Sequence, residues 1–180
     1  DNTALLEASE NGHIEVVRAL LKAGVGADVR RVDEYEYSPI SRACQGKHME
    51  VFRALVEAGG DVNTPELGGW TALHNASADG FIEGVRYLVE RGADVRRVDE
   101  IGQSPIYRAC YGKHMEIFRA LVEAGGDVNT PDSYGDTALN DASDHGFTEG
   151  VRYLVERGAD VNKSTTDGNG HTPLITASYW

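Results

Sequence analysis

Apolar residues at helical spacing alternate with glycine-containing breaks along the chain, and residues 33–65 show the pattern most simply. Two apolar faces with i, i+3, i+4 spacing lie on either side of a break at Gly46-Lys47. The first face consists of Ile40, Ala43 and Cys44. The second consists of Met49, Phe52, Leu55 and Val56. The pattern predicts two short amphipathic helices joined by a tight turn.

The ends of these two helices are also marked in the sequence. Ser38 is a favourable N-cap residue, and Pro39 suits the first helical position. Gly59-Gly60 is predicted to end the second helix, and residues 61–65 lead into a turn. Helices shorter than about 12–15 residues are marginal in water, so each must bury its apolar face against a neighbour.

The same unit recurs along the whole chain. First helices are predicted to begin at residues 38, 71, 104 and 137, a step of 33 residues, and two more members begin at 3 and 172. The copies 66 residues apart are the most alike, because 38–40 and 104–106 are both Ser-Pro-Ile. A fixed period of this length is typical of stacked supersecondary units.

Several motifs in these units resemble the ankyrin repeat. Residues 71–74 (Thr-Ala-Leu-His) and 172–175 (Thr-Pro-Leu-Ile) are similar to the T-P-L-H opening of that family, and 12–21 resembles its second helix. The resemblance covers essentially the whole chain and implies an all-α solenoid of antiparallel helix pairs with projecting β-hairpin-like loops. We expect one array over 1–180, with repeats at approximately 1–32, 33–65, 66–98, 99–131 and 132–166 and a partial repeat at 167–180.

Departures from the family pattern lead to two further expectations. Glu36 stands where the family usually has glycine at a loop tip, so the first loop is expected to have a different turn. Gly84 lies inside a predicted helix three residues after Phe81, and glycine there costs roughly 1 kcal/mol relative to alanine. We suggest that Phe81 fills the vacated volume. Alternatively, Phe52 uses it, or a recent tandem duplication carried an arbitrary residue pair along.

Charge and cysteine content restrict the kinds of partner. The net charge is −12 and the pI is near 4.8, which disfavours nucleic acid and modestly favours a basic partner. Cys44 and Cys110 occupy the same place in repeats two apart, about 20 Å by helix spacing, so we expect free thiols and an intracellular, cytoplasmic or nuclear, protein. No stretch approaches membrane-spanning length, and no membrane partner is expected.

The sequence contains no convincing catalytic or cofactor motif. Gly46-Lys47 lacks the upstream glycine and the following Ser or Thr of a phosphate-binding loop. Cys44 with His48, and Cys110 with His114, each offer two metal ligands where zinc takes four. We therefore expect no enzyme activity, no cofactor and no metal site.

The resemblance also implies where a partner would bind. Ankyrin partners usually contact the loop tips and the exposed face of the first helices, and six aromatic residues fall at such positions although aromatics make up 8% of the chain. Any one of these rings could instead pack on a neighbouring loop. The acids Asp79, Asp136, Asp141 and Asp144 at these positions suit a partner with basic and apolar residues. The selected contact residues are Tyr35, Tyr37, Arg42, Trp70, His74, Ile101, Gln103, Tyr107, Arg108, Tyr111, Tyr134, Asp136, Asn140 and Asp144.

These features predict a non-catalytic protein–protein interaction module that binds a polypeptide on its concave face. The alternative is a structural spacer, or an engineered repeat scaffold without a dedicated partner. The sequence stops within the first helix of a sixth unit, so its last apolar face lacks a polar cap. We accordingly expect a monomer, or weak self-association through this end.

Overall fold

The structure is a computed structural model that describes residues 3–24, 28–165 and 170–177. These residues form two compact units, 1–94 and 95–180, and each unit is a stack of short helical hairpins. No strand occurs in the described ranges. The all-α fold predicted from the apolar spacing is confirmed.

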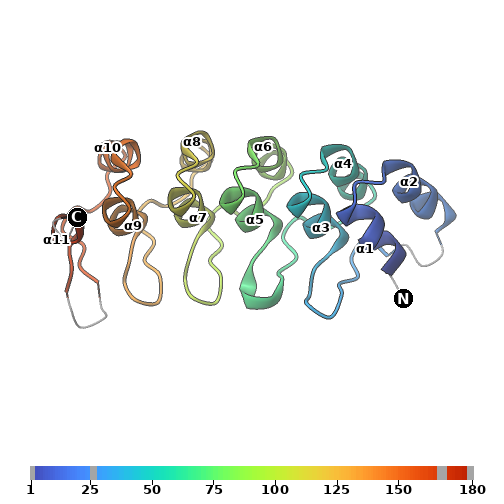
Figure 1. The fold of residues 1–180 in the computed structure, drawn as a ribbon, viewed down its shortest axis with the longest axis horizontal. Helices are drawn as coiled ribbons and strands as arrows, with labels where there is room; N and C mark the ends of the chain where they lie inside the picture. The colour runs from blue at the N-terminus through green and yellow to red at the C-terminus, as the bar shows by residue number, and fades with distance from the viewer. Residues whose placement is uncertain (1–2, 25–27, 166–169, 178–180) are drawn as a thin grey trace. The chain divides into compact units, whose positions relative to one another are not determined.

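The first unit contains three helical hairpins. Its helices are α1 (Thr3–Glu10), α2 (Ile14–Ala23), α3 (Pro39–Gln45), α4 (Met49–Glu57), α5 (Ala72–Ala78) and α6 (Ile82–Glu90). The first helices α1, α3 and α5 pack side by side in one row, and α2 packs against α4 in the second row (Figure 1).

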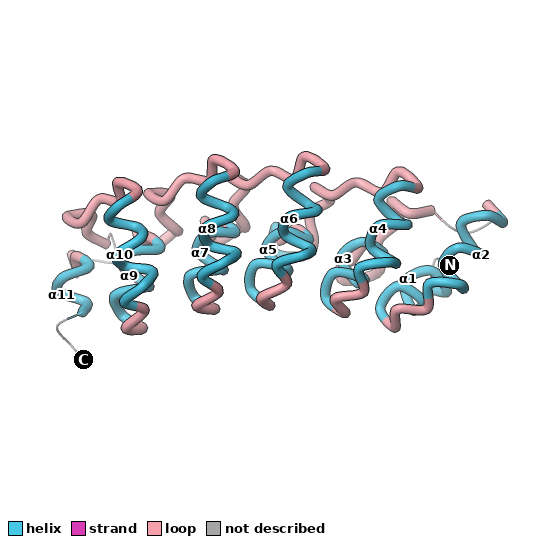
Figure 2. Tube along the Cα trace, turned by 90° about the horizontal axis from the view of Figure 1, so that it is seen from above, coloured by secondary structure: helices cyan, strands magenta, loops and turns pink. Residues whose placement is uncertain are grey.

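The second unit has the same construction. Its helices are α7 (Pro105–Tyr111), α8 (Met115–Glu123), α9 (Ala138–Asp144), α10 (Thr148–Glu156) and α11 (Pro173–Ala177). Helix α9 packs between α7 and α11, while α8 and α10 pair with α7 and α9 as second helices (Figure 2). The first helices therefore form one surface layer within this unit, and the loops project beyond them (Figure 1).

The predicted apolar faces form the core of each hairpin stack. Ile40 and Leu55 are almost fully buried, and Ser38 caps α3 by accepting a hydrogen bond from the Ser41 backbone N–H at 3.2 Å. Cys44 and Cys110 are free and buried, and each thiol donates to a backbone carbonyl of the next first helix. The predicted free thiols are confirmed, and burial raises the pKa of both.

The loops that precede the first helices are called fingers here: finger 1 is residues 33–37, finger 2 is 66–70, finger 3 is 99–103 and finger 4 is 132–136. Each closes with a backbone hydrogen bond between its first and last residues, for example from Asp33 N to Tyr37 O at 3.1 Å. The fingers thus resemble hairpins but are too short to form strands.

The expectation of a different turn in finger 1 is wrong. Glu36 adopts the left-handed conformation, with φ of 62°, and donates its N–H to Asp33 O, as Gly102 donates to Asp99 O in finger 3. The closing hydrogen bonds therefore hold a residue that lacks the conformational freedom of glycine. The unusual finger is finger 2, where Leu67–Gly69 forms a single turn of 3₁₀ helix.

The proposed exchange of volume between Phe81 and Gly84 is confirmed. A Cβ atom added to Gly84 would overlap the ring of Phe81, and Gly150 stands in the same relation to Phe147. Phe52 instead packs edge-on against Tyr87, with ring centroids 5.5 Å apart. The aromatic ring that precedes the helix thus occupies the space that the helical glycine leaves.

Candidate partner-binding site

The exposed surface of the fingers is built on buried or half-buried acidic residues at their first positions. Asp33 Oδ1 accepts hydrogen bonds from the backbone N–H groups of Tyr35 and Tyr37, each at 2.9 Å. Asp99 and Asp132 make the same pair of bonds in fingers 3 and 4. The acid holds the turn closed, and the side chain at the tip points away from it.

Each of these four fingers exposes one large apolar or aromatic side chain. The exposed fractions are 53% for Tyr35, 67% for Leu67, 44% for Ile101 and 59% for Tyr134. Large apolar side chains fixed on tight turns lose little conformational entropy when a partner covers them. Leu67 lies at a finger position but was not among the selected contact residues.

A side chain from the following first helix supports the acid at the base of three fingers. The Nη2 of Arg42 donates to Asp33 Oδ2 at 2.6 Å, and Arg108 repeats this bond to Asp99 at 2.6 Å. In finger 2 the matching pair is Asn75 Nδ2 and Glu66 Oε1, at 2.7 Å. These helix residues stand 33 positions apart, so the support is part of the repeat.

Electrostatic effects follow from these pairs. Burial opposes ionisation of Asp33, but the Arg42 guanidinium and two backbone N–H groups lower its pKa below the usual value. Burial raises the pKa of Glu66, whose partners Ser41 and Asn75 are neutral. Arg42 also lies over the Tyr37 ring, 4.3 Å from its centroid, so Tyr37 partly serves to stiffen finger 1.

Finger 4 breaks the pattern, because the supporting position is occupied by Asp141. Its side chain is only 5% exposed, its Oδ1 lies 3.3 Å from His145 Nδ1, and its Oδ2 has no hydrogen-bond partner among the described residues. Burial raises the pKa of Asp141 to about 6, with lowering contributions from His145 and from a hydrogen bond with Tyr107 and raising ones from Asp144 and Asp136. The fourth repeat therefore has no arginine or asparagine at the position that supports the acid of the other fingers.

Asp141 lies in the wall of a hollow of about 350 Å³, which we call the α9 hollow. Its lining comes from α7, finger 4, α9 and the loop before α11, all in the second unit. The lining residues are Tyr107, Tyr111, Asp136, Asn140, Asp141, Asp144, His145, Thr165 and His171. It combines carboxylates with aromatic rings and is open to solvent.

The structure distributes the selected contact residues of the first unit between exposed and buried places. Tyr35 is exposed, whereas Tyr37, Arg42 and Trp70 are half-buried. The ring of Trp70 lies 6.2 Å from that of His74. His74 is fully buried and accepts a hydrogen bond from the Thr71 backbone N–H at 3.2 Å, so it caps α5 and presents no surface to a partner.

Most of the selected residues of the second unit are accessible. Ile101, Tyr111, Tyr134 and Asp144 are exposed. The half-buried ones are Gln103, Tyr107, Arg108 and Asp136. Asn140 is 2% exposed, because its Oδ1 accepts hydrogen bonds from Thr137 at the start of α9. Five of these nine residues line the α9 hollow: Tyr107, Tyr111, Asp136, Asn140 and Asp144.

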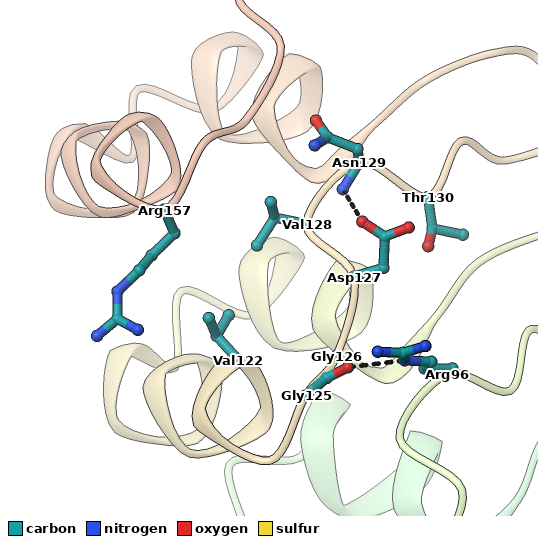
Figure 3. A pocket seen from close by; sticks show the side chains of 9 residues that line it. All are labelled: Arg96, Val122, Gly125, Gly126, Asp127, Val128, Asn129, Thr130 and Arg157. Atoms are coloured by element: carbon teal, nitrogen blue, oxygen red, sulfur yellow. Dashed lines mark hydrogen bonds between the residues drawn. The ribbon is translucent and has the colours of Figure 1, made fainter.

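A second hollow of about 520 Å³ lies beside the turn after α8 (Figure 3). Its two arginines are already engaged: Arg96 Nε donates to Gly125 O at 2.8 Å, and Arg157 lies 4.8 Å from the centroid of the Tyr153 ring. The first unit repeats the former bond between Arg30 and Gly59 at 3.3 Å. The arginine bond beside this hollow is therefore a recurring feature of the turn that ends a repeat.

The described residues offer few other kinds of site. No group of three or more His, Cys, Asp or Glu side chains is arranged to hold a metal ion within the described ranges. None of the helices described above is long and apolar enough to cross a membrane.

Comparison with protein families adds one finding to this geometry. A family model described as ankyrin repeats (3 copies) matches residues 5–99 and 95–165. The matched ranges cover most of each unit and include all four fingers.

Proposed function

We propose that this chain, which belongs to the ankyrin repeat family, is a non-catalytic interaction module that binds a partner polypeptide through its fingers and first helices. Ankyrin repeats are generally protein–protein interaction modules, and the family is typically non-catalytic. The observation that carries the proposal is the large side chain exposed at the tip of each of fingers 1–4. Each is held on a turn that an acidic side chain or a 3₁₀ helix closes.

The chemistry of the surface favours a partner segment with apolar and basic residues. Exposed Tyr35, Ile101 and Tyr134 offer apolar contact area, while Asp136 and Asp144 add negative charge on the same side of the second unit. The net charge of −12 repels phosphate backbones and attracts cationic segments at long range.

A peptide-display selection on the whole chain tests this proposal. Selected peptides should bind at least tenfold more weakly to Trp70→Ala and to Tyr134→Ala, as measured by isothermal titration calorimetry. Val155→Ala is the matched control, because Val155 is 47% exposed on a second helix. If only the Val155 variant lost affinity, the binding face would be wrongly placed. Failure to select any peptide would favour the spacer alternative.

A further inference from the structure

In the first three repeats, a residue of the first helix donates a hydrogen bond to the acid that begins the finger. Comparison with these repeats shows which chemical group the fourth repeat lacks. The residues at this helix position are Arg42, Asn75, Arg108 and Asp141, and the acids at the first positions of the preceding fingers are Asp33, Glu66, Asp99 and Asp132. Arginine, asparagine and arginine each donate a hydrogen bond of 2.6 to 2.7 Å to the acid. The fourth repeat has an acid at both positions.

The two acids of the fourth repeat differ in their hydrogen-bond partners. Asp132 is 8% exposed, and its Oδ2 receives a hydrogen bond of 3.4 Å from Gln103 Nε2. The Oδ2 of Asp141 has no hydrogen-bond partner of good geometry within the described residues, although the side chain is 95% removed from solvent. The Tyr107 side chain is close enough to lower the pKa of this carboxyl by hydrogen bonding. An unpaired buried carboxylate oxygen is costly, because it has given up water without gaining a donor.

The surroundings of Asp141 match the needs of a planar cation. Tyr107 and Tyr111 provide aromatic rings, and Asp136 and Asp144 provide further negative charge around the α9 hollow. A guanidinium combines a fork of N–H donors with a flat face that stacks on aromatic rings. The two arginines that already support fingers 1 and 3 show the same pairing with carboxylates in this chain.

A metal ion is the less suitable occupant of the hollow. The carboxylates and histidines around it are not arranged as a group of three or more metal ligands. An organic cation needs no such convergence, since it can bond one carboxylate while its stem lies along the tyrosine rings.

We propose that the α9 hollow receives an arginine side chain of the bound partner, whose guanidinium bonds Asp141, the acid that stands at the helix position of Arg42 and Arg108. This inference rests on the proposed function, because it supplies the basic residue of the partner segment. It assigns Asp141 as the central contact and Tyr107 and Tyr111 as the walls.

The direct test is an NMR titration of the whole ¹⁵N-labelled chain with Nα-acetyl-arginine amide. We expect saturable shifts confined to residues 107–111, 136–145 and 170–172. The neutral isostere Nα-acetyl-citrulline amide should give none. Shifts spread over the acidic surface, or equal binding of citrulline, would overturn the proposal. Equal binding of Nα-acetyl-lysine amide would overturn the choice of a guanidinium.

Free arginine, whose carboxylate the acidic rim repels, should bind at least threefold more weakly. Tighter binding of the free amino acid would reject a peptide as the source of the arginine.

Two variants separate the role of Asp141 from general acidity. Asp141→Asn should weaken binding of the arginine derivative at least fivefold, whereas Glu123→Gln removes an exposed carboxylate of α8 outside the hollow and should leave binding unchanged. Equal losses in both variants would contradict the proposal.

A substitution that supplies the cation from within the chain gives an independent readout. Asp141→Arg recreates the pairing of Arg108 with Asp99, so it should raise the thermal midpoint and abolish binding of the arginine derivative. A lowered midpoint together with unchanged binding would show that the hollow does not accept a guanidinium at this place. Because these measurements use no partner peptide, their failure would leave the result of the peptide selection intact.

Discussion

At the scale of single residues, Asp141 combines an effect on stability with the proposed contact to a partner. This carboxyl is buried without a full set of donors, and burial raises its pKa to about 6, above the ordinary value of 3.8. The folded protein therefore holds this proton over a pH range in which the unfolded chain has already lost it. The contribution of Asp141 to stability is largest below about pH 4 and falls as the pH rises through 6.

The variant Asp141→Asn should lack this pH dependence. The unfolding free energy of the variant minus that of the unchanged chain should increase by about 1–3 kcal/mol between pH 4 and pH 7.5. Urea unfolding at several pH values measures this difference, and other titrating groups cancel in it. A difference that stayed constant with pH would mean that Asp141 ionises as easily in the folded state as in the unfolded one.

A second residue with a local conformational cost is Glu36 at the tip of finger 1. Its φ of 62° is unfavourable for a side chain with a Cβ and easy for glycine. Glu36→Gly should stabilise the protein by about 0.5–1 kcal/mol, since relief of strain outweighs the greater chain entropy of glycine. Urea unfolding checks this. Glu34→Gly in the same finger is the control and should not stabilise.

At the scale of elements, the second helices are of two kinds, with glycine or with a β-branched residue in the first turn. They differ in which side chain fills the space beside that residue. In α6 the ring of Phe81 occupies the space beside Gly84, and in α4 the matching residues are His48 and Val51. His48 instead bonds the carbonyl of Glu10 at 2.9 Å, and Val51 is buried. In each repeat the residue before the second helix matches the residue three positions later in size. One member of such a pair therefore cannot be exchanged between repeats without the other.

This consistency predicts the outcome of a swap. Gly84→Val should overpack against Phe81 and destabilise the protein by about 1–3 kcal/mol, measured from the midpoint of chemical unfolding. Adding Phe81→His to the same chain should restore at least half of the loss, since it vacates the space. If the double variant were no more stable than the single one, the ring and the glycine would not share a volume.

The turn after the first helix shows how a lysine can replace glycine while the turn keeps its conformation. Lys47 and Lys113 replace glycine after the first helix and adopt φ of 56°. Their Nζ atoms donate to the carbonyls of Asp79 and His145 at the ends of the next first helices, at 2.7 and 2.9 Å. A cation at a helix C-terminus is favourable, which offsets part of the backbone cost.

At the scale of the whole chain, the repeat period and the motifs within it were sufficient to predict the helices and the family. The 33-residue step gave the starts of α3, α5, α7 and α9, because Ser38, Thr71, Ser104 and Thr137 are their N-caps in the structure. The turn of finger 1 could not be predicted, since the hydrogen bonds that hold Glu36 come from the closed finger and not from its own preference.

The candidate site was less accessible to sequence reasoning. His74 was selected because it matches a contact position of the family. Whether a side chain at such a position is exposed depends on local capping, and here the imidazole accepts a hydrogen bond from Thr71. The proposed role of Asp141 emerges only when positions 42, 75, 108 and 141 are compared together with the acids that begin the preceding fingers. The arrangement of one array over 1–180 stays a prediction, as does self-association through the last repeat.

The buried thiols give each half of the chain its own chemical reporter. Cys44 belongs to the first unit and Cys110 to the second, and each sulfur is sealed beneath the neighbouring helix by its bond to Ala72 or Ala138. A thiol reagent can react only after the local hairpin has separated. The two labelling rates therefore measure, without any introduced probe, how often each half opens, and a bound guest that clamps one half would slow only the cysteine within it.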